Sequence, residues 1–157
     1  MHMAAPTTDP ATLAPAEPAA WRGLLRVHSA LVKALDAELE SAHDFPLSSY
    51  EVLLHLGDAP EGRLRMSELA EHVLLSRSGM TRLIDRLERD GLVARDTCSR
   101  DGRGCYAALT ERGREVLEEA RVTHLAGVRA RFLEQFDEDE LRTLAAYWER
   151  VVPGASS

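Results

Sequence analysis

A chain of 157 residues with 45% hydrophobic and 29% charged residues predicts a soluble globular protein of one domain, or one domain with a helical extension. Apolar runs stay below the roughly 18 residues of a membrane helix, no signal peptide is recognisable, and two cysteines make no disulfide framework, so we expect a cytoplasmic protein. The net charge of −7 argues at first sight against a nucleic-acid partner.

The N-terminal part of the chain divides into a tail and a long helix. Residues 1–18 are rich in alanine, proline and threonine and show almost no periodicity, which predicts a disordered tail. Apolar residues then recur at three- and four-residue spacing, so a long amphipathic helix is predicted over Trp21–Ala42.

Two shorter helices are predicted next. A capping box of Ser48 and Glu51 opens a helix over Tyr50–Leu56, which ends at Gly57. Leu64 is expected to form a single-residue bridge to a small sheet. The run MSELAEHV then predicts a short helix, which a tight connection joins to the helix that follows.

That following helix has two different faces. Ser76 is placed to cap its first turn, and Gly91 ends it with a left-handed residue. An apolar stripe is formed by Met80, Leu83, Ile84 and Leu87. The opposite face carries Ser78, Thr81, Arg82, Asp85 and Arg89, with Arg77 and Arg86 on the flanks. Such a face suits a DNA major groove, where arginine bonds guanine in a bidentate way, and an ordinary solvated face is the alternative.

A basic hairpin follows the glycine. Leu92–Arg95 and Cys105–Leu109 are short strand-like runs, and the Ser-Arg-Asp-Gly-Arg-Gly between them has turn chemistry. Arg100 and Arg103 flank its tip, which suits a DNA minor groove or nearby phosphates. The stretch Ser76–Arg103 has seven arginines and five acidic residues, a net charge of +2, so the rest of the chain carries −9. The positive charge is therefore local.

Two amphipathic helices are predicted after the hairpin. Thr110 caps the first, which reaches about Phe132, and Asp137 starts the second with three more acidic residues in its first turn. A small winged domain needs neither these helices nor the N-terminal one, so we expect the terminal helices of two chains to interlock. The apolar residues expected in that interface are Leu24, Leu141, Leu144, Trp148 and Val151. A monomeric core closed by the same stripes is the alternative.

The run MSELAEHVLLSRSGMTRLIDRLERDGLVAR, followed by DGRGCYAALTERG, resembles the core of MarR-type regulators, the multiple-antibiotic-resistance family. The resemblance covers roughly Trp21 to Val152, and its wing carries the pair Asp101 and Arg103. Leu74 departs from the family pattern, which usually has glycine in this turn. The resemblance implies a mainly α fold with a small β wing: a tail over 1–18, a winged helix-turn-helix over 48–109, and dimerisation helices over 19–47 and 110–157.

The resemblance also implies a transcriptional regulator that binds double-stranded DNA as a homodimer. Two recognition helices about 34 Å apart would match a pseudo-palindromic operator. The expected DNA contacts are Ser76, Arg77, Ser78, Thr81, Arg82, Arg86, Arg100 and Arg103, with Asp101 holding the turn of the wing. Regulators of this kind are commonly repressors released by a small phenolic or anionic effector. The side chains expected in its crevice are Trp21, Arg22, Arg26, His28, Tyr50 and His55, although each histidine also suits plain packing.

Other chemistry has little support in this sequence. The six histidines form no motif at metal-ligand spacing, and no phosphate loop, GxSxG motif or Cys–His pair points to an enzyme, so neither metal nor cofactor is expected. Cys98 and Cys105 lie on the two arms of the hairpin, where a disulfide would act as a redox switch, and two unreactive thiols are the favoured alternative. A winged-helix module for protein–protein contact is the second function considered. The arginines of the helix face and of the wing favour DNA binding over this alternative.

Overall fold

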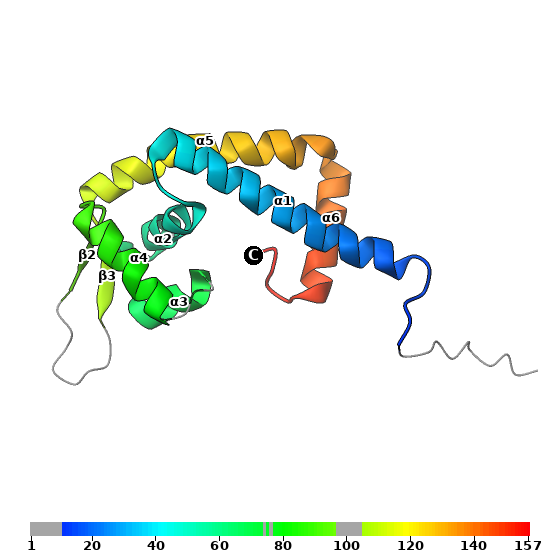
Figure 1. The fold of residues 1–157 in the computed structure, drawn as a ribbon, viewed down its shortest axis with the longest axis horizontal. Helices are drawn as coiled ribbons and strands as arrows, with labels where there is room; N and C mark the ends of the chain where they lie inside the picture. Colours follow the sequence, from blue (N-terminus) through cyan, green and yellow to red (C-terminus); the bar gives the residue numbers. More distant parts are fainter. Residues whose placement is uncertain (1–10, 74, 76, 97–104) are drawn as a thin grey trace, which may run out of the picture. The chain divides into compact units, whose positions relative to one another are not determined.

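The computed structural model describes residues 11–73, 75, 77–96 and 105–157, and it divides the chain into two compact units, Met1–Ala34 and Leu35–Ser157. In chain order the elements are α1 (Glu17–His43), α2 (Leu47–Asp58), η1 (Pro60–Gly62), β1 (Arg63–Arg65), α3 (Met66–Val73), α4 (Arg77–Arg89), β2 (Val93–Arg95), β3 (Tyr106–Leu109), α5 (Glu111–Arg131), η2 (Leu133–Gln135) and α6 (Glu138–Val151) (Figure 1). The predicted mainly α fold with a small β wing is confirmed. No helix among the described residues is long and apolar enough to cross a membrane.

The three strands form one antiparallel sheet in the order β1-β3-β2. Leu64 joins the sheet, as predicted, and pairs with Ala107, but its neighbours Arg63 and Arg65 also pair with β3. The predicted single-residue bridge is therefore wrong, because β3 is long enough to pair with a complete three-residue strand on this side. Its other edge pairs with β2, with Arg95 opposite Ala107.

The hydrophobic core of the second unit lies between α2, α3, α4 and α5. Leu53 and Leu56 of α2, Leu69 of α3 and Leu117 of α5 are almost completely buried. The stripe predicted for α4 joins them through its buried members Met80, Ile84 and Leu87, while Leu83 is partly buried at the edge of the same core. Burial of this stripe fixes which face of α4 remains outside.

The ends of α4 and α5 follow the predicted signals. Gly91 has a φ of +75°, the left-handed conformation that glycine adopts at helix ends, and the Leu92 amide donates to the Leu87 carbonyl at 2.9 Å. The Thr110 hydroxyl caps α5 by accepting from the Gly113 amide at 2.9 Å, and it donates to the Gly91 carbonyl at 2.7 Å. Thr110 thereby ties the end of α4 to the start of α5.

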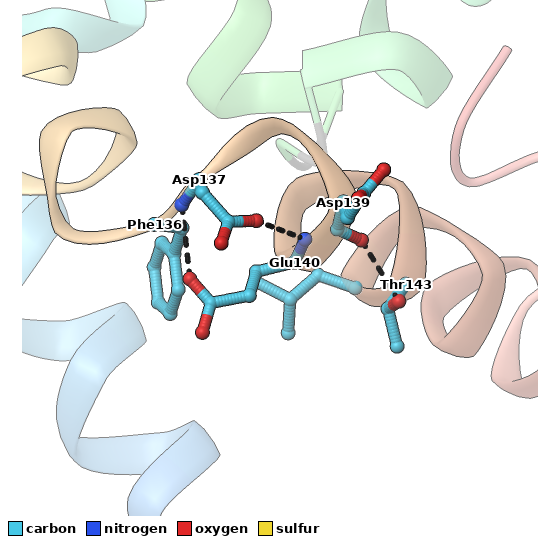
Figure 2. A pocket seen from close by; sticks show the side chains of 6 residues that line it. Phe136, Asp137, Asp139, Glu140 and Thr143 are labelled. Carbon is cyan, nitrogen blue, oxygen red and sulfur yellow. Dashed lines mark hydrogen bonds between the residues drawn. The ribbon is translucent and has the colours of Figure 1, made fainter.

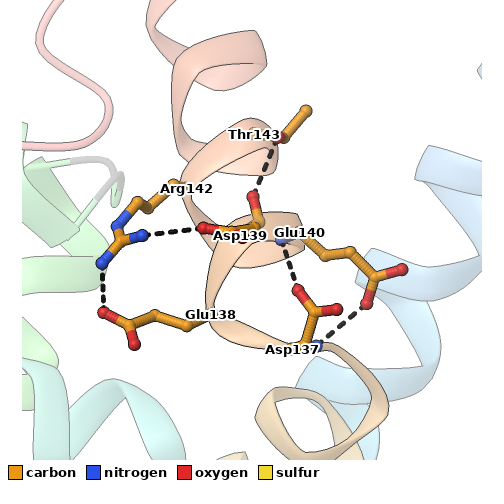
Figure 3. Close-up of polar contacts among 6 residues, drawn as sticks. All are labelled: Asp137, Glu138, Asp139, Glu140, Arg142 and Thr143. Atoms are coloured by element: carbon orange, nitrogen blue, oxygen red, sulfur yellow. Dashed lines mark hydrogen bonds and ion pairs between the residues drawn. The ribbon is translucent and has the colours of Figure 1, made fainter.

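The start of α6 is a complete capping box. The Asp137 carboxylate accepts from the Glu140 amide, and the Glu140 carboxylate accepts from the Asp137 amide, each at 2.9 Å (Figure 2, Figure 3). Arg142 adds ion pairs to Glu138 and, at 2.8 Å, to Asp139 on the exposed side of the same turn (Figure 3).

The start of α2 differs from the prediction. The helix begins at Leu47 after Pro46, so the predicted capping box of Ser48 and Glu51 is wrong. The Leu47 amide instead donates to the Asp36 carboxylate of α1 at 2.8 Å. The same helix continues through Gly57 to Asp58 instead of ending at Leu56.

Candidate nucleic-acid interface

The outer face of α4 is polar and basic, as predicted. Ser78, Thr81 and Arg82 are exposed, whereas Met80 and Ile84 on the opposite face are buried. Arg82 makes no hydrogen bond or ion pair with any residue in the described part of the chain, so its guanidinium is available to an external acceptor. Hydroxyl groups beside an unpaired guanidinium form a surface that suits phosphates and base edges.

The two later arginines of α4 make contacts within the protein. Arg86 lies at a flank of the face, and its Nη2 donates to the carbonyl of Asp44 at the corner between α1 and α2, at 3.5 Å. Asp44 has a positive φ of 58°, which is the conformation that turns the chain there. Arg89 donates through Nε to the Asp85 carbonyl at 3.4 Å. Arg86 thus has a contact within the protein that Arg82 lacks, and its predicted role in DNA binding stays a prediction.

The structure adds an arginine that the sequence reasoning did not include in the site. Arg95 of β2 forms an ion pair with Asp85 on the exposed face of α4, and its amide donates to the Glu88 carboxylate at 3.1 Å. The residue alternation in a strand would have placed Arg95 on the same face as buried Val93, and an inward-facing arginine calls for a carboxylate partner.

The outer face of the small sheet holds a second group that the sequence reasoning missed. The Tyr106 ring lies under two guanidinium groups, with its centroid 4.2 Å from Cζ of Arg63 and 5.5 Å from Cζ of Arg65. Arg65 also donates to the Tyr106 hydroxyl at 3.0 Å, and Arg63 pairs with Asp96 at 3.1 Å. The alternating Arg-Leu-Arg sequence before α3 was the pattern from which two arginines on one face of a strand could have been predicted. The two arginines are balanced by nearby carboxylates, so this group is not a strongly basic patch.

Several predicted contacts fall outside the described residues. These are Ser76, the side chain of Arg77, and Arg100, Asp101 and Arg103 of the predicted wing, together with Cys98. Cys105, directly before β3, is disulfide-bonded. The favoured alternative of two unreactive thiols is therefore wrong for Cys105.

The residues predicted to bind an effector fall into the two units. Trp21, Arg22, Arg26 and His28 lie on α1 in the first unit, where Trp21 is 56% exposed and Arg22 donates through Nε to the Pro18 carbonyl at 3.3 Å. Tyr50 and His55 lie on α2 in the second unit. A crevice that combines all six residues stays a prediction.

Within the second unit, Tyr50 and His55 each pack against another aromatic ring. Tyr50 is buried, and its ring lies 4.5 Å from that of His124 on α5. Burial raises the pKa of the Tyr50 hydroxyl, with a smaller opposing influence of Arg121, and burial lowers the pKa of His124. His55 stacks on His72 of α3, so the packing role that the sequence left open for this histidine is the one that its surroundings support.

A pocket at the start of α6 is lined by Phe136, Asp137, Asp139, Glu140, Thr143 and Leu144 (Figure 2). Its two capping carboxylates already accept from the amides of the helix end. The Thr143 hydroxyl donates to the Asp139 carbonyl at 2.8 Å. These polar groups are accounted for by the helix cap itself. In the described part of the chain, no cluster of three or more histidine, cysteine, aspartate or glutamate residues is suited to a metal ion.

Comparison with known proteins identifies the family. A sequence model of the MarR family matches residues 43–104. The crystal structure of Sco3205, a MarR family transcriptional regulator from Streptomyces coelicolor in complex with DNA, is 31% identical to this chain. The two superpose with a TM-score of 0.84 over 96% of this chain and 94% of Sco3205. The chain belongs to the MarR family.

Two HTH-type transcriptional regulators from Bacillus subtilis (strain 168) are also similar to this chain. The HTH-type transcriptional repressor YetL is 32% identical over 106 residues, which cover 65% of this chain and 63% of YetL. The HTH-type transcriptional regulator YkoM is 30% identical over 104 residues, which cover 65% of this chain and 66% of YkoM. The matches thus span slightly less than two thirds of either relative. Membership of a family of transcriptional regulators also confirms the prediction that the chain is not an enzyme.

Proposed function

We propose that this MarR-family chain is a homodimeric, sequence-specific DNA-binding regulator, and that its recognition surface is the outer face of α4. The observation that carries the proposal is the exposed Arg82 beside Ser78 and Thr81, on a helix whose opposite stripe is buried. Arg82 would bond a guanine edge in the major groove, and the two hydroxyls would meet phosphates or neighbouring bases. Arg100 and Arg103 of the wing would contact the minor groove or its phosphates.

The state of α6 supports the homodimer. None of its residues is buried in the single chain, although Leu141, Leu144, Trp148 and Val151 form an apolar stripe along it. Val151 is 72% exposed and Trp148 is 38% exposed, and Leu24 on α1 is also exposed. Apolar stripes left open in this way fit helices that a second copy covers. A twofold dimer would then present two copies of α4 to half-sites one DNA turn apart.

Repression and release by a small effector form the finer part of the proposal. YetL is a transcriptional repressor, and this chain shares 32% of its aligned residues. The effector is expected to be phenolic or anionic and to contact side chains from the set Trp21, Arg22, Arg26, His28, Tyr50 and His55. It would act by binding more tightly to the conformation with the lower DNA affinity.

The test is a fluorescence-anisotropy titration against palindromic duplexes selected in rounds from a random pool, at two salt concentrations. Enrichment of an inverted repeat bound by one dimer, with affinity that falls steeply with salt, is the expected result. Absence of any enriched duplex would favour the protein–protein contact module. Repeating the titration under reducing and oxidising conditions tests the redox alternative, which the bonded state of Cys105 favours over two free thiols.

A further inference from the structure

Arg95 occupies the junction between the sheet and the recognition helix. It is the last residue of β2 and pairs with Ala107, which pairs in turn with Leu64 on the other side of β3. Residues opposite one another in an antiparallel sheet share a face. Because Ala107 is completely buried, this row lies on the inner face of the sheet, and β2 packs against α4 there (Figure 1).

The contacts of Arg95 are directed at the acidic residues of α4. Its guanidinium pairs with the Asp85 carboxylate, while its backbone amide donates to Glu88 at 3.1 Å. The Arg95 side chain is only 30% exposed, whereas that of Asp85 is 50% exposed. Its Nε and Nη2 are both buried and make no hydrogen bond among the described residues, so the contact of Nη2 with Asp85 is an ion pair. The guanidinium is thus committed to Asp85, and it approaches this carboxylate from the protein side.

Asp85 lies within the proposed DNA-binding face of α4, close to Arg82. It follows Arg82 by three residues and precedes Arg89 by four, so all three lie on one face of α4. A carboxylate at this point would repel the DNA phosphates around the base edge that Arg82 is expected to approach. Pairing with Arg95 offsets the charge of this carboxylate beside Arg82.

We infer that Arg95 is a positioning residue of the recognition surface: it neutralises Asp85 from the wing side and holds α4 against β2. This inference rests on the proposed function, because it assumes that α4 enters the major groove. Arg95 itself stays behind the helix face and makes no contact with a base. Its contribution to affinity therefore depends on the presence of the Asp85 carboxylate, which is a property that a double-mutant cycle measures.

The experiment compares five full-length variants with the wild type on one selected duplex. One of them is Asp85→Asn alone, which completes the double-mutant cycle and is expected to bind within about threefold of the wild type. Arg95→Ala is expected to bind the duplex about tenfold more weakly, because the Asp85 carboxylate then faces the DNA phosphates without a neutralising cation. Adding Asp85→Asn to Arg95→Ala removes that charge and is expected to return the affinity to within about threefold of the wild type. Arg112→Ala, which removes an exposed arginine paired with Glu115 at 3.2 Å on α5, is the matched control and should bind like the wild type. Arg82→Ala serves as the test of the docking surface, and circular dichroism and thermal unfolding verify that each variant is folded.

The outcomes separate the two ideas. Weakening by Arg95→Ala with recovery in the double variant supports the inference. Wild-type DNA affinity in Arg95→Ala, or an affinity of the double variant as low as that of Arg95→Ala alone, overturns the inference. In either case the affinity of Arg82→Ala still tests the docking surface independently. If Arg82→Ala binds like the wild type, or no duplex is bound at all, the proposed recognition surface is wrong and the role of Arg95 falls with it. Should Arg95→Ala unfold, the uncharged and longer Arg95→Gln replaces it, and full affinity in Arg95→Gln would contradict the inference.

Discussion

The imidazole rings of His55 on α2 and His72 on α3 stack with their centroids 4.9 Å apart and their planes 20° from parallel. Burial lowers the pKa of His55, the nearby His72 lowers it further, and Asp58 opposes both. His124 on α5 has its pKa lowered by burial as well, with Glu38 acting in the opposite direction. Because their pKa values are lowered, His55 and His124 stay neutral in the folded protein at a pH where the same histidines of the unfolded chain begin to bind protons.

This relationship predicts a pH-dependent stability. Between the lowered folded pKa and the ordinary value of about 6.5, the unfolded chain binds more protons than the folded protein. The free energy of unfolding should therefore fall as the pH drops from about 7 to below 6.5. Urea unfolding at several pH values measures this slope. The variant His55→Gln should show a shallower slope than the wild type, and His28→Gln on α1 is the control that should not. A slope that is identical in all three proteins would contradict the assignment to His55.

Loss of the Arg82 side chain should weaken DNA binding more than loss of any other single described residue of α4. If Arg82 reads a base edge, Arg82→Ala should cost about 1–3 kcal/mol on a selected duplex and relax the preference at one base position. Anisotropy titrations on the selected duplex and on single-base variants of it measure both effects. Arg86→Ala is the informative comparison, because the Arg86 guanidinium is directed toward the Asp44 carbonyl. Equal losses for the two variants would argue against a special place for Arg82.

The sequence predicted the recognition helix well because its signals are local. The spacing of Met80, Ile84 and Leu87 sets the buried side, and Gly91 supplies the positive φ that ends the helix. The start of α2 was missed for the opposite reason. Its first amide is satisfied by Asp36, which comes 11 residues earlier on another helix, so a local Ser-x-x-Glu pattern was read as a cap that the fold does not use.

The same distinction explains which site residues were missed. Arg95 meets Asp85 only after a strand has folded back onto the preceding helix. The alternation of the strand places Arg95 on the inner face but does not show which carboxylate it meets there. Arg65 and Tyr106 are 41 residues apart and meet through sheet pairing. Long-range contacts of this kind depend on the register of β1 with β3, which no local pattern in the sequence specifies.

A close helix–strand contact at Gly113 predicts a site of strong sensitivity. A Cβ atom at this position would lie 2.0 Å from the Leu92 carbonyl oxygen and 2.8 Å from the Leu109 Cδ1 atom. Since a backbone atom cannot yield easily, Gly113→Ala should destabilise the protein by about 1–3 kcal/mol. Gly23 on α1 has nothing within 4 Å of the corresponding position, so Gly23→Ala should be neutral or stabilising by up to about 1 kcal/mol. Urea unfolding at one fixed protein concentration compares the two, and equal effects would contradict the close contact.

The apolar stripe of α6 leads to a prediction about the oligomeric state. Trp148 and Leu144 belong to a helix with no buried residue in the single chain, so a charge at either position should leave the fold of the monomer intact. If a second copy covers this stripe, Trp148→Asp or Leu144→Asp would bury an unpaired carboxylate in the interface and dissociate the dimer. Light scattering coupled to size-exclusion chromatography measures the mass directly.

A control on the same helix separates the stripe from α6 in general. Ala146 is exposed and lies on a different face from Leu144 and Trp148, so Ala146→Asp should remain dimeric. The dissociated variants should also lose most of their affinity for an inverted repeat, because each half-site is then bound separately and the gain from linking two recognition helices disappears. A Trp148→Asp protein that keeps the mass of a dimer would place the interface elsewhere on the chain. If all three variants dissociate, the whole of α6, and not its apolar stripe, would be needed for the dimer.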